Sequence, residues 1–162
     1  MNKTTINVQA LIQKCAQNGI TISTAESCTG GLIAKLLTDV AGSSAVFHGA
    51  CVTYTNEVKQ LLLGVDPEII ERDTEVSHAC ARAMAEGVRQ KLGTTLAVST
   101  TGFAGPTGGT PEDPVGTVYL AISSPQGTVS ERLSLPSHHT REEIRSAAAQ
   151  RALVLLDQYA NR

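Results

Sequence analysis

Two side chains that can act as nucleophiles, Ser27 and Cys28, are neighbours in the segment 24–31, which reads TAESCTGG. A hydroxyl or a thiol can attack a carbonyl carbon once a base removes its proton. Gly30 and Gly31 follow, and glycine lets the backbone come close to a bound group. This order of residues favours nucleophilic chemistry on a small substrate. The alternative is a glycine-rich turn whose hydroxyls only cap a helix.

The flanking residues predict how this segment is held. Residues 20–23 are mostly β-branched, which is typical of a strand, and residues 32–40 place apolar side chains at helical spacing. A strand-to-helix turn puts the segment at a helix N-terminus, where unpaired N–H groups and a partial positive charge favour an anion or a developing oxyanion. We therefore expect the backbone near Gly30 and Gly31 to contact the substrate.

A second stretch, residues 54–59 (YTNEVK), offers a base. Asn56 is expected to cap a helix, which puts Lys59 in the first turn, where the helix dipole disfavours a cation. A lysine that is neutral near pH 7 can take the proton of a serine. Tyr54 closes the preceding strand and could relay that proton or orient the lysine. The alternative is a surface lysine and a half-buried tyrosine.

The start of the last helix offers a third candidate. Thr140 and Glu143 form a capping-box pattern, with Arg141 at the first helical position. A guanidinium there can hold a phosphate or carboxylate together with backbone N–H groups, and a solvated arginine is the alternative. His138 and His139 have no residue nearby in sequence that completes a metal site. We expect no metal and no cofactor.

Composition excludes several classes of protein. With 17% charged residues, a net charge of −2 and 3% aromatics, the chain has neither a broad basic face nor a stacking platform for nucleic acid. No run approaches the ~18 apolar residues of a membrane span. The four cysteines form no C-x-x-C pair and no signal sequence precedes them, so we expect reduced thiols and a cytoplasmic protein.

The predicted elements favour a single α/β domain over residues 1–162 with a mixed sheet. Segment 102–116 is rich in glycine and proline and is long for a compact domain, so we expect a lid or a binding loop. Helices are predicted at 5–18, 32–38, 56–63, 67–71, 77–92 and from 140, and strands at 20–23, 45–54, 94–100, 117–123 and 128–135.

Four ordered motifs together resemble one known family. They are AESCTGG at 25–31, YTNEVK at 54–59, TGFAGP at 101–106 and PVGTV at 114–118. From about residue 5 to residue 157 the chain is similar to the CinA C-terminal domain, the nicotinamide-nucleotide amidase (NMN deamidase) family. The resemblance implies a three-layer α/β/α domain with a mixed, mostly parallel sheet, and a homo-oligomer. Many relatives carry a further N-terminal domain. Because this sequence starts at Met1 without such a domain, we expect the stand-alone form.

The resemblance implies an activity as well. Such proteins are metal-free amidohydrolases that convert nicotinamide mononucleotide (NMN) and water to nicotinic acid mononucleotide and ammonia, in pyridine-nucleotide recycling. The expected partner is therefore a small nucleotide substrate. The nucleophile falls on Ser27, with assistance from Tyr54 and Lys59. Contacts with the substrate are implied for Ser44, Thr101, Gly102 and Arg141.

The chain departs from the family pattern at two places. Thr74-Glu75 stand where Gly-Ala is usual, and this change is expected to alter a packing contact only. His139-Thr140 stand where Gly-Asp is usual, beside Arg141, and this change bears on substrate preference. Two other functions stay open, a catalytically silent nucleotide-binding regulatory module and an amidase for another carboxamide.

Overall fold

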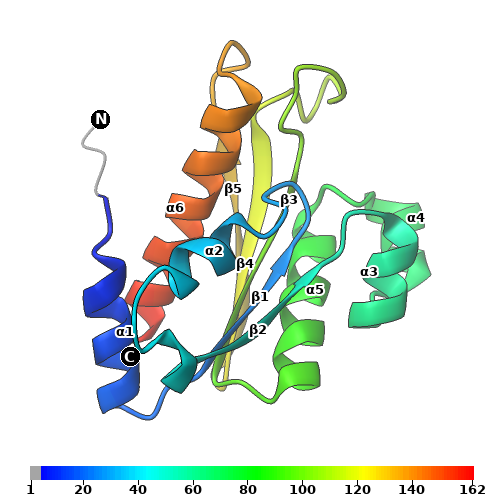
Figure 1. Cartoon of the computed structure of the whole chain (residues 1–162). Helices are drawn as coiled ribbons and strands as arrows, with labels where there is room; N and C mark the ends of the chain where they lie inside the picture. The colour runs from blue at the N-terminus through cyan, green and yellow to red at the C-terminus, as the bar shows by residue number, and fades with distance from the viewer. Residues whose placement is uncertain (1–4) are drawn as a thin grey trace.

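A computed structural model describes residues 5–162 and places five strands in one sheet (Figure 1). The order across the sheet is β2-β1-β3-β4-β5. β1 is parallel to both β2 and β3, whereas β4 is antiparallel to both β3 and β5. The sheet is therefore mixed, and all strands except β4 run in one direction. The strands are β1 (Ile22–Glu26), β2 (Phe47–Val52), β3 (Leu96–Gly102), β4 (Thr117–Ser124) and β5 (Gly127–Ser134).

Helices cover both faces of the sheet (Figure 1). One layer holds α1 (Val8–Gln17), α2 (Leu32–Thr38) and α6 (Arg141–Tyr159). The opposite layer holds α3 (Asn56–Leu63), α4 (Pro67–Asp73) and α5 (His78–Leu92). The predicted three-layer α/β/α architecture with a mixed sheet is confirmed.

The two faces of the sheet differ in side-chain size. Val98, Leu120 and Ile122 point into the cluster under α1, α2 and α6. Ala97 and Ala121 belong to the clusters under α5. Small residues on one face let α5 lie close against the sheet, while the larger ones fill the broader core on the other.

β1 continues further than the sequence pattern predicted. Residues 24–26 were expected in a turn, yet they pair with residues 50–52 of β2 and 98–100 of β3 and are fully buried. A strand with neighbours on both sides gains ladder hydrogen bonds for every residue it adds, which outweighs the polar character of Thr24 and Glu26. The turn is thus confined to residues 27–31.

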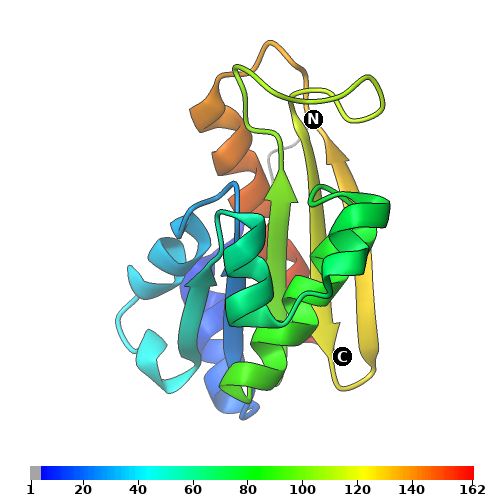
Figure 2. The same ribbon diagram turned by 90° about the vertical axis from the view of Figure 1, so that its right-hand side faces the viewer.

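The loop between β3 and β4 arches over the end of the sheet beside the start of α6 (Figure 2). Its two ends are tied by hydrogen bonds of 2.9 Å from Phe103 N to Thr117 O and from Gly116 N to Phe103 O. Asp113 in its middle accepts hydrogen bonds from Tyr119 Oη at 2.9 Å and from Arg132 Nε at 3.0 Å. These contacts hold the loop over one end of the sheet.

Candidate active site

A pocket of about 420 Å³ opens at the carboxyl ends of the parallel strands. This is the usual place for a ligand in an α/β sheet, and the volume suits a small molecule. Its walls come from six segments of the chain: the turn after β1, the start of α3, the segment before α5, the end of β3, the loop after β3 and the start of α6. Six of the predicted site residues line it: Ser27, Tyr54, Lys59, Thr101, Gly102 and Arg141.

Ser27 and Lys59 meet in this pocket although 32 residues separate them in sequence. Lys59 Nζ lies 3.1 Å from Ser27 Oγ, and it donates a second hydrogen bond of 3.1 Å to the carbonyl oxygen of Thr53. Lys59 is 1% exposed and Ser27 is 8% exposed. A buried amine within hydrogen-bond distance of a hydroxyl is the geometry of a base and its nucleophile.

The environment of Lys59 favours the neutral amine for a different reason from the one predicted. Thr55, not Asn56, caps α3, since its hydroxyl accepts from Val58 N, so Lys59 lies beyond the third helical position. Burial is the main cause that lowers the pKa of Lys59, because a cation loses its hydration there. Nearby Cys80 and Glu75 partly oppose this shift by favouring the charged form.

The helix N-terminus that was expected to hold an anion is already occupied by the chain itself. Oε1 of Glu26 accepts hydrogen bonds from Gly31 N at 3.1 Å and Ile33 N at 3.0 Å, and Oε2 accepts from Ala34 N at 3.0 Å. Thr29 Oγ1 donates to Oε1 at 2.8 Å. Glu26 therefore caps α2 from inside the core, and these N–H groups cannot bind a substrate.

Replacing Glu26 with glutamine is expected to destabilise the fold by about 2–4 kcal/mol. The amide group has two donors, and at least one of them would face backbone N–H donors, leaving buried groups unpaired. Urea unfolding measures the change. Glu71→Gln, on the exposed side of α4, is the matched control and should leave the midpoint unchanged. An unaltered midpoint for Glu26→Gln would mean that the carboxylate does not hold the turn.

Gly30 and Gly31 shape the turn instead of lining the pocket, which corrects the predicted contact. Their φ angles are +58° and +97°, in the region that favours glycine. Arg145, on α6, donates to the carbonyl oxygens of Cys28 at 3.1 Å and Thr29 at 3.0 Å. No sequence pattern indicated Arg145, because its function depends on how α6 packs beside the turn.

Tyr54 and Arg141 meet at the rim of the pocket. Arg141 Nη2 donates to Tyr54 Oη at 2.8 Å, and Nη1 donates to the carbonyl oxygen of Gly105 at 2.6 Å. Tyr54 is 58% exposed, and within residues 5–162 it makes no hydrogen bond to Ser27 or Lys59. The structure therefore does not support the proton relay or the orienting contact predicted for Tyr54.

Ser44 lies at the opposite end of the sheet. It belongs to the short 3₁₀ helix Ser43–Ala45, which precedes β2, whereas Ser27 follows the last residue of β1. Because β1 and β2 are parallel and β1 has 5 residues, about 17 Å of strand separates these ends. Ser44 does not line the pocket formed by its own chain, which corrects the predicted contact with the substrate.

Thr101 and Gly102 form part of the wall at the end of β3. Thr101 Oγ1 donates to the carbonyl oxygen of Glu75 at 2.6 Å, which ties this strand to the segment before α5. A Cβ atom on Gly102 would lie 2.5 Å from Thr117 O, so only glycine fits beside β4. Both residues line the pocket, but the Thr101 hydroxyl is engaged within the chain.

Comparison with known proteins gives the family. The CinA C-terminal domain family matches residues 5–160. The chain belongs to this family. A CinA-like protein of Myxococcus xanthus is 49% identical over 150 residues, which cover 92% of this chain and 35% of that protein. A putative competence-damage inducible protein of Symbiobacterium thermophilum is 48% identical over 160 residues, covering 93% of this chain and 37% of that protein.

Solved structures of CinA proteins share the fold. The competence/damage inducible protein CihA of Agrobacterium tumefaciens superposes with a TM-score of 0.88 at 39% identity, covering 100% of both chains. A CinA superfamily protein of Escherichia coli gives 0.90 at 28% identity, covering 98% of this chain and 93% of that one. The chain spans about a third of the length of the curated relatives it matches.

The first departure from the usual CinA pattern falls on the pocket. Thr74 has a φ of +69°, a conformation that a β-branched residue adopts at a cost and glycine adopts freely. Glu75 lines the pocket, so the expectation of a packing change alone is wrong. At the second departure, Thr140 caps α6 in a complete capping box with Glu143, which confirms the predicted helix start.

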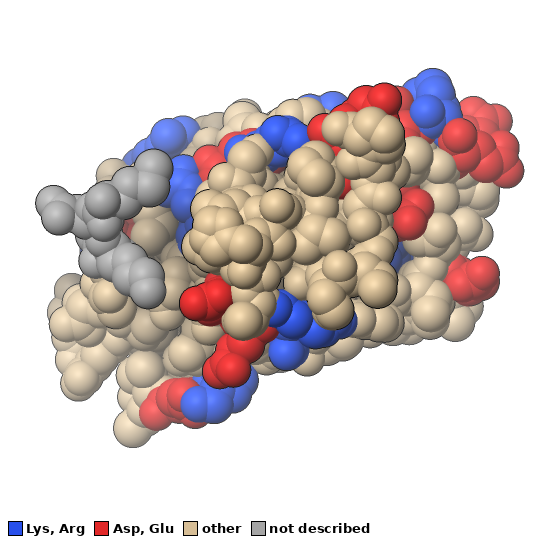
Figure 3. All heavy atoms as spheres, turned by 90° about the horizontal axis from the view of Figure 1, so that it is seen from above, with Lys and Arg blue, Asp and Glu red and all other residues tan. Residues whose placement is uncertain are grey.

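The surface around the pocket of this CinA domain has no single sign of charge. Figure 3 looks down on this end of the molecule and shows Lys and Arg interspersed with Asp and Glu. Among residues 5–162, no group of three or more His, Cys, Asp or Glu side chains is placed to hold a metal ion. None of the helices in this part of the chain has the length and apolar character needed to cross a membrane.

Proposed function

We propose that this chain is an amidohydrolase that deamidates NMN to nicotinic acid mononucleotide and ammonia. One observation carries the proposal, the buried contact of 3.1 Å between Lys59 Nζ and Ser27 Oγ in a pocket of about 420 Å³. A lysine buried against a serine costs stability unless the amine is neutral, and a neutral amine is what a serine nucleophile needs. Membership of the CinA C-terminal domain family supports the same reaction class.

The proposed reaction proceeds in two halves. Ser27 Oγ attacks the carboxamide carbon while its proton passes to the neutral amine of Lys59. The resulting ammonium protonates the leaving nitrogen, the carbon–nitrogen bond breaks and ammonia departs, leaving an ester on Ser27. A water molecule then attacks the ester carbon and gives its proton to Lys59. The proton returns to Ser27 Oγ as the carboxylic acid product leaves.

Backbone donors for the oxyanion come from the turn that follows Ser27. Cys28 lines the pocket, and its N–H group makes no hydrogen bond to another residue between 5 and 162. The residue directly after a nucleophile commonly supplies such a donor. We therefore assign the oxyanion site to this turn, in place of the N-terminus of α2, whose N–H groups Glu26 already binds.

An ammonia-release assay with NMN, nicotinamide riboside and nicotinamide tests the proposal. We expect ammonia from NMN above the other two, together with a product that elutes later on anion exchange, because it carries one more negative charge. Binding of NMN without ammonia would favour a regulatory module that performs no chemistry. Ammonia from another carboxamide but not from NMN would show an amidase of different specificity.

Arg141→Ala is expected to raise the KM for NMN about tenfold or more and to change turnover of nicotinamide riboside little. Two of the five N–H donors of Arg141 are used within the chain, which leaves three for a phosphate. Steady-state kinetics on both substrates measures the difference. Arg132→Ala is the matched control, since Arg132 also holds the loop but does not line the pocket. Equal losses on both substrates would make Arg141 a loop anchor only.

A further inference from the structure

The pocket contains a carboxylate that makes no direct contact in the proposed chemistry, although its charge partly opposes the lowering of the Lys59 pKa. Glu75 is half-buried in the segment before α5 and lines the pocket. Within residues 5–162 its carboxylate accepts no hydrogen bond and forms no ion pair. Its backbone is fixed, because Thr101 Oγ1 donates to its carbonyl oxygen at 2.6 Å. A half-buried charge without a partner, on a fixed backbone, is suited to receive a cation from a ligand.

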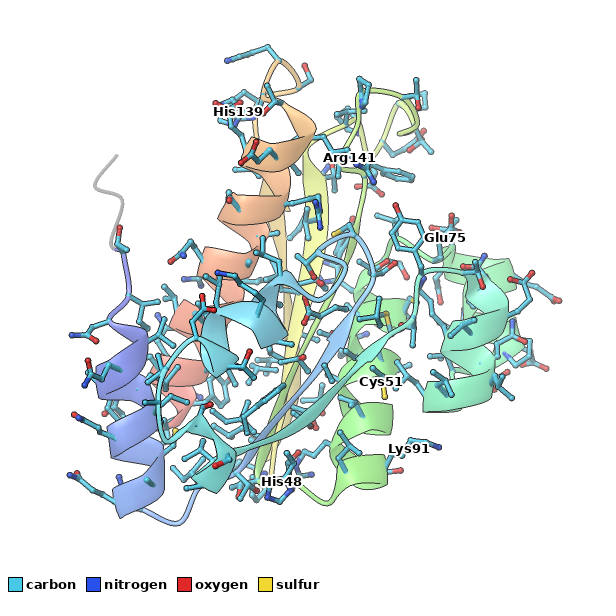
Figure 4. All side chains as sticks on the ribbon, in the orientation of Figure 1. His48, Cys51, Glu75, Lys91, His139 and Arg141 are labelled. Carbon is cyan, nitrogen blue, oxygen red and sulfur yellow. The ribbon has the colours of Figure 1, made fainter. Side chains whose placement is uncertain are left out.

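The other charged groups of the pocket do not take this place. Glu57 also lines the pocket, but it is exposed in the first turn of α3, where water and the helix N-terminus stabilise its charge. Arg141 is held by Tyr54 and Gly105 at the rim of the pocket. Figure 4 shows Glu75 and Arg141 coming from different elements at the same end of the molecule.

An aromatic ring accompanies the carboxylate. Phe103 is half-buried, lines the pocket and packs against the cluster of Val76 and Tyr119. A flat cation gains from the negative face of an aromatic ring as well as from a nearby carboxylate. The two groups together fit a positively charged aromatic ring better than a neutral one.

We propose that Glu75 is a specificity-determining residue that selects carboxamides carried on a positively charged pyridinium ring. This extends the proposed function, because NMN carries such a ring between its carboxamide and its phosphate. In the bound nucleotide, the carboxamide lies at Ser27, the ring passes Glu75 and Phe103, and the phosphate reaches Arg141. Glu75 acts on specificity through its charge beside the ring and makes no contact with the reacting carbon.

Equilibrium binding of two nucleotides that differ mainly in the charge of the ring separates the effect of that charge from the effect of ligand shape. The probes are NMN and its reduced form, which keeps the carboxamide, ribose and phosphate but has a neutral dihydropyridine ring. The host is Ser27→Ala, which does not consume NMN, and calorimetry compares it with Ser27→Ala/Glu75→Gln. We expect Glu75→Gln to lower the preference for NMN over its reduced form about fivefold to tenfold, as loss of one partly screened charge pair implies. Ser27→Ala/Glu71→Gln should keep the full preference.

Each other outcome decides the matter. Equal weakening of both nucleotides would overturn the proposal, since a contact with the ribose or a structural effect would do this. No change in the preference, or no binding of either nucleotide, would overturn it as well. A Glu75-dependent preference in a chain that releases no ammonia would support the proposal and refute the amidase function alone. Ammonia release from NMN, with a preference that Glu75→Gln does not change, would support the amidase function and refute the role proposed for Glu75.

Discussion

Ser27→Ala is expected to reduce ammonia release from NMN by about 10⁴-fold or more, whereas Cys28→Ala keeps most of it. Intrinsic chemistry would favour the thiol, which is the stronger nucleophile at pH 7. Burial, however, raises the pKa of Cys28 to about 12, so almost no thiolate forms. Ser27 has the amine of Lys59 at 3.1 Å, which can take its proton.

The position of Cys28 predicts a small effect on stability. It is 5% exposed and packs in the cluster with Ile33 and Leu37, so Cys28→Ala should cost about 1 kcal/mol of unfolding free energy. Iodoacetamide should leave turnover of the wild type unchanged, because a buried thiol with a raised pKa reacts slowly with an alkylating agent. A Ser27→Ala protein that retains turnover and loses it on alkylation would transfer the nucleophile to Cys28.

Motif chemistry predicted the centre of the site well. Residue types suggested that Ser27 and Lys59 could act as nucleophile and base, and the resemblance to the family brought the two together; the structure places them in contact. The mixed sheet between two helix layers was also predicted, from alternating helices and strands and one late hairpin, but the order of the strands was not. Local sequence patterns could not predict how deeply each residue is buried. Thr24 and Glu26 look like turn residues until strands on both sides are known.

Two of the errors share one physical origin, the competition of side chains for the same backbone groups. A free helix N-terminus attracts anions, but Glu26 is close enough to satisfy it first. Thr55 and Asn56 are both good caps, and local propensity does not rank them. Ser44 was placed by resemblance alone, with no element to carry it to the carboxyl end of the sheet.

Lys59→Met is expected to lower kcat by about 10²–10⁴-fold without loss of fold. Methionine has a similar length and no charge, so it fills the buried site and leaves Ser27 without a base. Lys59→Arg should be equally inactive, because a guanidinium stays protonated, and it should also be less stable since a charge is then buried. Ammonia release and the thermal midpoint, measured together, separate loss of the base from loss of the fold.

The wild-type pH profile tests the same residue without mutation. Only the neutral amine of Lys59 can accept the proton of Ser27, so kcat/KM should rise with pH and level off above the pKa of Lys59. Burial lowers that pKa from 10.5, so the plateau should begin at a lower pH than for an exposed lysine. In Lys59→Met, the residual kcat/KM should no longer rise with pH over this range. A rise that persists in Lys59→Met would assign the titrating group elsewhere, and the base would then not be Lys59.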